Sequence, residues 1–292
     1  MPETNPTPSN EEIAHVLGNI VIPPCPRIVL ALVQEARSDD PDMGKLDKLI
    51  TGDIGLASAV IKSANSPFYG LNHKVQAVKS ALQVLGIRSV TNMVTLLSLR
   101  NTLSAPSARP DPFWDSFWDR TNYHAIACAR LAKQLRFISA DGAYTFGLFN
   151  DCGIPVLVQR FADYKDTLQL AVTTGKPLVD VETERHQINH ALVGSILART
   201  WQLPDLVCDA IRDHHALGAL YGGNEQGDVI VLSAISLIAD YLVNDFLGTP
   251  QEAEWDQHGG QALDYLGMEE DELFEAKTDI LEELEEARHY RK

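Results

Sequence analysis

The sequence predicts an all-α protein built from two helical lobes. Apolar residues recur at three- and four-residue spacing through almost the whole chain, which is the period of an α-helix that packs by one face. Runs that alternate apolar and polar residues, the pattern of half-buried strands, are scarce. Three prolines fall within Ala105–Pro112 and interrupt the helical pattern, so we place the boundary between the lobes in that linker, at residues 105–112.

The first lobe is expected over residues 20–104, after a polar, proline-rich lead-in at residues 1–19 that we interpret as disordered. Pro23, Pro24 and Pro26 make their segment extended, because proline removes a backbone donor and restricts the residue before it. Asp53 is placed to cap the helix that is expected to begin at residue 54. The helices expected in this lobe are residues 27–36, 45–51, 54–65, 75–85 and 89–103.

The second lobe is expected over residues 113–248, followed by an acidic helical extension over residues 249–292. In the extension, Leu273, Ile280 and Leu284 share one face and acids occupy the other, which predicts a surface helix docked by its apolar stripe. The helices expected from the linker onward are residues 113–135, 140–149, 154–161, 164–173, 179–185, 190–201, 204–214, 229–246 and 269–288.

An aromatic group opens the long helix after the linker. Helical spacing relates Phe113 to Phe117 and favours packing between the lobes, while an exposed patch that binds a partner is the alternative. Trp114, Trp118 and Tyr123 belong to the same group. Their exposure distinguishes the two interpretations.

The composition indicates a soluble globular protein, and we expect it in the cytoplasm. With 292 residues, of which 45% are hydrophobic, the chain can bury a large core. No basic region followed by an apolar run marks a secretory signal. The longest apolar stretch, residues 229–243, contains polar interruptions and is shorter than the roughly 20 residues of a membrane span. The four cysteines form no CxxC pair, so we expect reduced thiols.

The net charge is strongly negative and unevenly distributed. The chain carries a formal charge of -16, and residues 249–292 contain 14 acidic against 4 basic residues. This tail would repel a phosphate backbone, and no dense run of Lys or Arg elsewhere offers a basic patch. We therefore expect no nucleic-acid partner and no membrane partner.

Two sets of short motifs occur in order along the chain. Those of the first lobe are Ile22-Pro23-Pro24-Cys25-Pro26, Leu49–Leu56, Ala64-Asn65-Ser66 and Ala81–Gly86. Those of the second lobe are Gly147–Gly153, Glu182–Gly194, Trp201-Gln202-Leu203-Pro204 and His214-His215. Together they resemble the HDOD family, a group of all-α bacterial regulatory domains related to the HD-type metal phosphohydrolases. The resemblance covers about residues 20–245 and departs from the family at Ile54, where proline is usual.

The resemblance implies a degenerate HD-like second lobe. In the catalytic HD relatives a divalent metal is held by a helical histidine, a His-Asp pair and a later helical aspartate, with extra histidines in some subfamilies. By position, His124 matches the first histidine, Asn150-Asp151 the pair and Asp240 the late aspartate. Residues 190, 214 and 215 match the extra histidines.

Asparagine therefore stands where the family's paired histidine would be. A His-Asp pair gives a metal an imidazole nitrogen and a carboxylate, and the metal then activates water. Asn150 offers only a neutral carbonyl oxygen, which suits calcium or magnesium better than zinc, iron or nickel. If the protein is an enzyme, Asp151 is the catalytic carboxylate. The candidate ligands of a divalent metal ion, the one cofactor implied, are His124, Asp151, Asp240, His190 and His215.

Each candidate also has a structural explanation. A histidine such as His124, among apolar residues of a long helix, can be hydrogen-bonded in the core. Asn150-Asp151 is suited to ending one helix and capping the next. Asp240 shares a face with Ser236, so a solvated stripe is an alternative. The histidines at 214 and 215 lie at the C-terminus of a predicted helix, where the helix dipole favours protonated imidazole.

Three functions remain open. The family motifs with the broken His-Asp pair favour a regulatory module without hydrolase activity, which acts through signalling proteins or a nucleotide messenger. The surviving ligands favour a metal-dependent phosphohydrolase with a partial site. A helical scaffold without a small-molecule site would show a second lobe filled by apolar side chains.

Overall fold

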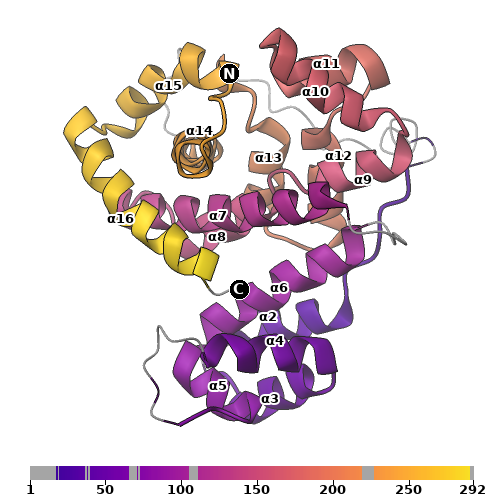
Figure 1. Ribbon diagram of the computed structural model, residues 1–292, viewed down its shortest axis with the longest axis vertical. Helices are drawn as coiled ribbons and strands as arrows, with labels where there is room; N and C mark the ends of the chain where they lie inside the picture. The colour runs from indigo at the N-terminus through magenta and orange to yellow at the C-terminus, as the bar shows by residue number, and fades with distance from the viewer. Residues whose placement is uncertain are drawn as a thin grey trace.

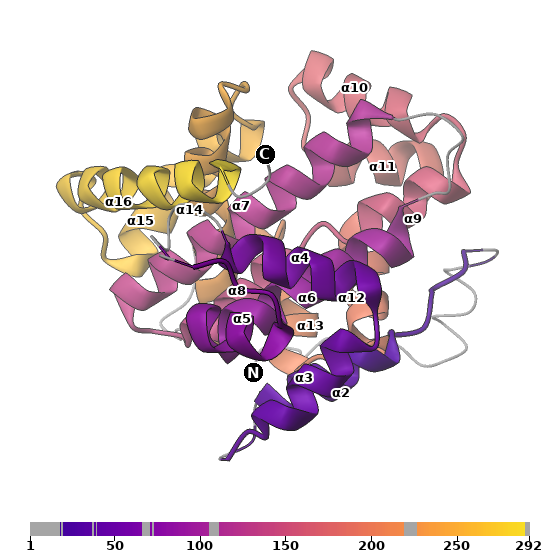
Figure 2. The same ribbon diagram turned by 60° about the horizontal axis from the view of Figure 1, so that its bottom comes forward.

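The computed structural model describes residue 18 and residues 20–36, 38, 40–65, 71, 73–104, 111–218 and 227–289. These residues form helices and no strand, which confirms the all-α prediction. A smaller lobe of N-terminal helices packs against a larger lobe (Figures 1 and 2). The expected lead-in, apart from residue 18, and residues 105–110 of the expected linker lie outside the described residues.

The smaller lobe contains α2 (Arg27–Ala36), α3 (Met43–Thr51), α4 (Ile54–Ala64), α5 (Val78–Leu85) and α6 (Ile87–Leu103). The carboxylates of Asp42 and Asp53 accept hydrogen bonds from the first turns of α3 and α4, which confirms the predicted cap at Asp53. Gly86 has a φ of 80°, and this left-handed backbone lets the chain turn by 113° between α5 and α6. The core of the lobe includes Leu46, Ile50, Val60 and Leu82.

The larger lobe surrounds one apolar helix. Its helices are α7 (Pro112–Leu135), α8 (Ala140–Phe149), α9 (Gly153–Arg160), α10 (Tyr164–Thr174), α11 (Leu178–His186), α12 (His190–Thr200), α13 (Asp205–Asp213), α14 (Asp228–Leu247), α15 (Ala253–Leu266) and α16 (Glu270–His289). Figure 1 views α14 end-on, with α7, α13 and α15 around it. Within the described ranges α14 is the one unbroken helix long and apolar enough to cross a membrane, and 67% of that window is buried inside the protein. Its composition is that of a core helix.

The helix α6 contributes to both lobes. Val94 lies in the core of the smaller lobe, whereas Leu103 packs in the core of the larger one. Trp114 and Trp118 are buried in that same larger core, and the indole N–H of Trp118 donates to Ser104 Oγ at 2.8 Å. The aromatic group therefore packs where α6 meets α7, as its helical spacing predicts.

The extended proline segment also reaches the larger lobe. The indole N–H of Trp201 donates to the carbonyl oxygen of Pro23 at 3.0 Å, so the first motif of the chain contacts a motif of the other lobe. Elsewhere, α2 and α6 face α8 and the turn between α12 and α13 across a cavity of about 520 Å³. The lobes therefore meet along α6 and around the rim of this cavity.

The helix α15 is a structural element that the apolar pattern does not predict, because Gly259 and Gly260 weaken the helical signal. A Cβ at Gly259 would lie 2.9 Å from the indole ring of Trp255, so glycine makes room for this side chain. The indole stacks on Tyr241 of α14, with ring centroids 4.1 Å apart. This stacking attaches α15 to the central helix of the lobe.

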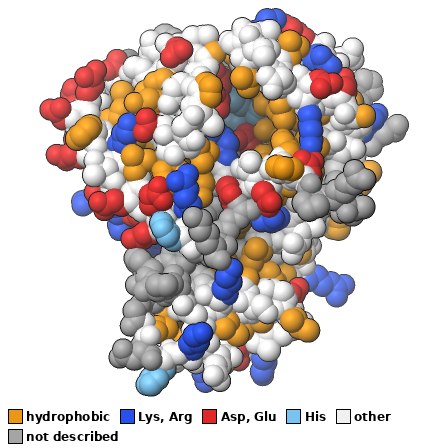
Figure 3. All heavy atoms as spheres, viewed as in Figure 1, with side chains coloured by type: hydrophobic (Ala, Val, Ile, Leu, Met, Phe, Trp, Pro, Cys, Tyr) orange, Lys and Arg blue, Asp and Glu red, His pale blue; other side chains and the backbone are white. Residues whose placement is uncertain are grey.

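The helix α16 docks by its apolar stripe, as predicted for the C-terminal surface helix. Its buried residues are Ala276, Ile280 and Leu284. Acidic side chains gather on the opposite surface (Figure 3). This helix therefore covers the larger lobe while it presents much of the chain's negative charge to solvent.

Candidate metal centre

Two glycines allow the helices that build the site to approach each other closely. A Cβ at Gly147 would lie 2.9 Å from the Cα of Ala125, so glycine lets α8 lie directly against α7. A Cβ at Gly153 would lie 2.1 Å from the carbonyl oxygen of His190, so glycine lets α9 begin against the start of α12. The turn that carries Asp151 connects these two contacts and is thereby held beside His190.

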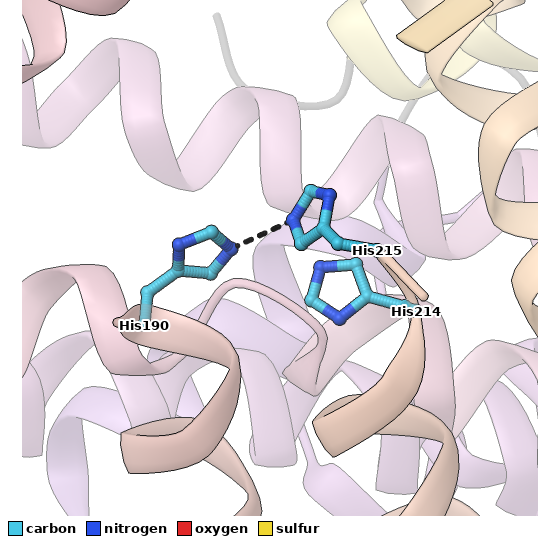
Figure 4. A group of neighbouring side chains, drawn as sticks. All are labelled: His190, His214 and His215. Carbon is cyan, nitrogen blue, oxygen red and sulfur yellow. Dashed lines mark hydrogen bonds between the residues drawn. The ribbon is translucent and has the colours of Figure 1, made fainter. Parts of the chain in front are cut away.

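Three histidine rings converge next to this turn. His190 begins α12, while His214 and His215 follow α13 (Figure 4). The Nε2 atoms of His190 and His215 are 3.0 Å apart, and one ring nitrogen from each of the three lies within 4.8 Å of the others. The Nε2 atom of His214 is buried without a hydrogen-bond partner in the described part of the chain. When the other ring nitrogen of a neutral imidazole is the donor, this nitrogen carries a lone pair that can accept a hydrogen bond or bind a metal ion.

Each of the three rings is oriented through its other nitrogen. The Nδ1 atom of His190 lies 2.7 Å from Glu182 Oε2. The Nδ1 atom of His215 lies 2.8 Å from Glu254 Oε2. The Nδ1 atom of His214 donates to a backbone carbonyl of α13 at 2.7 Å. Such contacts set the tautomer and the ring plane of metal-binding histidines and leave Nε2 for the metal.

Glu182 is the most enclosed charged group of the site. Its side chain is fully buried, and it accepts hydrogen bonds from the Tyr164 hydroxyl and from the backbone N–H of His190. A buried carboxylate is stable only when its oxygens are satisfied in this way. Glu182 therefore holds His190 in place.

Asp151 lies beside two of the histidines and remains partly accessible. Its Oδ1 atom is 3.4 Å from His190 Nε2 and 3.9 Å from His214 Nε2, and 26% of its side chain is exposed. Although burial opposes ionisation, His190, His214 and His124 hold the pKa of Asp151 far below its ordinary value. The carboxylate is thus ionised and able to bind a cation.

The histidines differ in charge because their neighbours differ. Burial disfavours protonation, but the carboxylates of Glu182 and Asp151 raise the pKa of His190 to about 10. Burial, with His215 and His190 nearby, holds the pKa of His214 well below its ordinary value. His214 is therefore neutral, which differs from the expectation for a histidine at a helix C-terminus, because desolvation and cationic neighbours outweigh the helix dipole.

His124 and Asp240 form a second polar group between α7 and α14. The Nε2 atom of His124 is 3.6 Å from Asp240 Oδ2, and its Nδ1 atom lies 3.1 Å from the carbonyl oxygen of Gly147. On α14, Ser236 and Asn244 are each 2% exposed. The polar stripe of α14 therefore faces α7, and the alternative of a solvated stripe is wrong.

Arg120 joins this second group from one helical turn before His124. Its guanidinium lies 2.7 Å from Asp240 Oδ1 and 2.9 Å from Glu252 Oε1. Although burial opposes ionisation, His124 and Arg120 hold the pKa of Asp240 below its ordinary value. The ion pair links α7 and α14 to the residue that precedes α15.

The structure thus divides the predicted metal ligands between two groups. Asp151 lies beside the histidine cluster, whereas His124 and Arg120 both contact Asp240. Within the described residues, the group of three whose ligand atoms lie within 4.8 Å consists of His190, His214 and His215. The single set of ligands around one ion that the sequence suggests stays a prediction.

Sequence analysis missed several residues that shape the site. Arg120 precedes His124 by four residues and so shares its helix face, a spacing that signals the contact. Glu182 lies inside a motif of the resemblance, yet nothing in the pattern distinguishes it from a surface acid. Glu254 carries no sequence signal, because its contact with His215 depends on where α15 docks.

The histidine cluster fits a transition-metal ion of the zinc class. A tetrahedral zinc ion with Zn–N distances of about 2.0 Å needs nitrogens roughly 3.3 Å apart. The 3.0 Å between two Nε2 atoms and the unpartnered Nε2 of His214 are compatible with that donor set. The group around Asp240 does not fit as well, because a guanidinium already binds its carboxylate.

The comparisons with known proteins agree with the fold. The family model of the HDOD domain matches residues 22–217. An uncharacterized protein of Treponema pallidum (strain Nichols) is 25% identical over 197 residues, which are 67% of this chain and 38% of that protein. This chain therefore spans well under half the length of that relative.

Two solved structures have the same arrangement of helices. A protein of Marinobacter aquaeolei VT8, provisionally named a signal transduction protein, is 23% identical with a TM-score of 0.72, covering 93% of this chain and 60% of that one. A protein of Shewanella amazonensis SB2B, provisionally named a phosphohydrolase, is 20% identical with a TM-score of 0.65, covering 92% and 91%. At these identities the likeness establishes the fold.

Proposed function

Because this chain belongs to the HDOD domain family, we propose that it is a regulatory signal-transduction module that holds one transition-metal ion in its larger lobe and does not hydrolyse phosphoesters. Signalling proteins, or a nucleotide messenger, are the partners that this proposal implies. The observation that carries it is the convergence of three histidines whose second nitrogens are already engaged.

The donor set favours a closed site. Catalytic zinc is held by three protein ligands and keeps one position for water, whereas structural zinc has four protein ligands. Three imidazoles supply nitrogens, and the ionised Asp151 lies close enough to two of them to complete a fourth position. An ion bound this way stabilises the helix ends of α12 and α13 and the turn before α9.

Two features oppose hydrolysis. Asn150 replaces the imidazole that the catalytic relatives place beside Asp151, and it is buried with 2% exposure. Arg120 binds the carboxylate of Asp240, which is the late aspartate of the family pattern. A second metal, which many phosphohydrolases need to stabilise the attacking and leaving oxygens, would compete with that guanidinium.

The experiment strips metal from the purified chain, reloads it with Zn²⁺ or Mn²⁺, and measures bound metal and hydrolysis of a chromogenic phosphodiester. We expect one zinc per chain and no metal-dependent turnover. His214→Ala should weaken zinc binding by at least the roughly 10- to 100-fold that loss of an outer-shell partner costs, because it removes a ligand. His289→Ala, at the exposed end of α16, is the matched control and should bind zinc like the wild type.

The experiment distinguishes failure of the proposed metal site from failure of the proposed absence of hydrolysis. Turnover that Asp151→Ala abolishes would establish the hydrolase alternative and contradict a purely regulatory role. If the chain retains no zinc, or if His214→Ala does not change its zinc binding, the proposed metal site is wrong. The regulatory role would then be tested separately, by direct binding of a cyclic dinucleotide.

A further inference from the structure

The cavity of about 520 Å³ between the lobes, which we call the interlobe cavity, has walls from both of them. The smaller lobe contributes Leu30 and Val33 of α2 and Thr91 of α6. The larger lobe contributes Phe149, which ends α8, and Trp201, which follows α12. We propose that the interlobe cavity binds an uncharged, mostly apolar small molecule that carries at least one hydrogen-bonding group.

The size and the apolar walls of the cavity are those of a ligand site. Sites for small molecules are typically clefts of about 300 to 1,000 Å³, lined mainly by apolar and aromatic side chains and often placed between domains. Phe149 and Trp201 are 0% and 2% exposed, and their rings meet edge to face with centroids 5.7 Å apart. Such an aromatic wall suits a flat apolar ring.

One buried hydroxyl in the wall lacks a hydrogen-bond partner. Thr91 is 8% exposed, and its Oγ1 atom has no partner among the described residues. One turn further along α6, Thr95 lines the same cavity, and its hydroxyl donates to the carbonyl oxygen of Thr91 at 2.8 Å. A buried hydroxyl without a partner is unfavourable. Thr91 is therefore the residue that a polar group of the ligand would satisfy.

Tyr144 supplies a second polar group from the larger lobe. It lines the cavity from α8 and is half-buried. Burial raises the pKa of Tyr144 above its ordinary value, so the phenol stays protonated and can donate a hydrogen bond. A ligand with a hydroxyl or carbonyl oxygen thus has polar groups available in both lobes.

The charges around the cavity disfavour an ionic ligand. Among the described lining residues, the two charged side chains are Arg88 and Asp141, and they pair with each other at 2.9 Å. Both are exposed, at 71% and 60%, so this pair belongs to the rim. A phosphate or carboxylate group would be desolvated against apolar walls without a cation to balance it. The ligand is therefore neutral, which distinguishes it from a nucleotide messenger.

A molecule in this cavity would contact both lobes at once. The indole N–H of Trp201 already donates to the carbonyl oxygen of Pro23, so the ligand would lie beside an existing contact between the lobes. Because it would bind the assembled lobes and not the separated ones, it should raise the melting temperature of the chain.

The test titrates β-naphthol and β-naphthalenesulfonate into the full-length chain by isothermal titration calorimetry. The two probes share one ring system, and only the sulfonate is charged at neutral pH. We expect one β-naphthol to bind per chain and the sulfonate to bind at least about 10-fold more weakly. Val33→Trp places a bulky ring in the cavity wall and should abolish β-naphthol binding. Val172→Trp is the matched control, because Val172 is 68% exposed on α10, and it should bind like the wild type.

Thr91→Val isolates the hydrogen bond. Valine keeps the shape of threonine without the hydroxyl, so the ligand-free variant should melt at or above the temperature of the wild type. Its affinity for β-naphthol should fall about 2- to 10-fold, the range expected for one hydrogen bond. Thr95→Val is the matched control and should keep the wild-type affinity, because the hydroxyl of Thr95 is already bonded within α6.

The inference is wrong if the wild type does not bind β-naphthol up to its solubility limit, or if the sulfonate binds as tightly. It is equally wrong if a folded Val33→Trp chain keeps the wild-type affinity. Should Val33→Trp fail to fold, as circular dichroism would show, Thr91→Val decides, and an unchanged affinity there overturns the inference. The zinc content of the same samples reports separately on the histidine cluster, so failure at the cavity leaves the proposed metal site unaffected.

Discussion

Glu35 joins two helices of the smaller lobe through a single carboxylate. It lies near the end of α2 and accepts a hydrogen bond from the backbone N–H of Asp42 at 2.8 Å and another from the ammonium of Lys45. The hydrogen bond from Lys45, with that from Asp42, lowers the pKa of Glu35. The ionised form is therefore favoured in the folded protein relative to the unfolded chain.

A pH series of Glu35→Gln tests this contact. Because the folded pKa is lower than the ordinary value of 4.5, the stabilisation is fully present above pH 4.5 and is lost as the pH falls through the folded pKa. We expect urea unfolding to show the wild type more stable than Glu35→Gln at pH 7, with a smaller difference at pH 4. A difference independent of pH would contradict the ionic contact.

Close backbone contacts position α9 against α12 in the larger lobe. At the start of α9, Gly153 lies so near the backbone of α12 that even one methyl group has no room. In contrast, Gly260 within α15 has no atom within 4 Å of the place where its Cβ would be. A side chain at Gly153 would therefore clash with α12, whereas a side chain at Gly260 would meet no other atom.

The pair predicts opposite effects of the same substitution. Gly153→Ala should lower the free energy of unfolding by about 2 kcal/mol or more, because backbone atoms of α12 must shift. Gly260→Ala should raise it by roughly 0.5 to 1 kcal/mol, since alanine is the better helix former. Chemical denaturation followed by circular dichroism measures both. Equal effects would show that α9 and α12 are not in the close contact described.

Gly153→Ala should also weaken zinc binding, because it displaces His190, while Gly260→Ala should leave it unchanged. Zinc titration of the two variants separates this effect from stability. This links the packing of α9 on α12 to the proposed metal site.

At the scale of the whole molecule, α6 is the structural link between the lobes. Val94 in its middle and Leu103 at its end belong to different cores, and a cavity of about 520 Å³ lies between α2 and α8. Destabilising one core should therefore also destabilise the other, because the two halves of a continuous helix cannot unfold independently without breaking that helix.

Leu46→Ala tests the coupling of the lobes. Leu46 is fully buried in the smaller lobe, so the substitution should cost about 2 to 5 kcal/mol. The four tryptophans, Trp114, Trp118, Trp201 and Trp255, all lie in the larger lobe. We expect their fluorescence transition to shift together with the circular dichroism transition. A fluorescence midpoint equal to that of the wild type would show independent lobes.

The sequence by itself determined the helical class, the near-complete set of helices and the family. Helices such as Arg27–Ala36 and Ala140–Phe149 agree with the expected bounds, because their period and end signals lie within a few residues of each other. The same local information indicated that His190 and His215 belong to a polar site.

Only the tertiary structure decided how those polar residues combine. The contact of Glu254 with His215 spans 39 residues and that of Arg120 with Asp240 spans 120, and each depends on where whole helices dock. Docking is set by packing, such as the stacking of Trp255 on Tyr241, which leaves no periodic signal in the chain. For this reason the sequence indicated which residues are candidates for the site, whereas only the fold shows that three histidines cluster and that Arg120 pairs with Asp240.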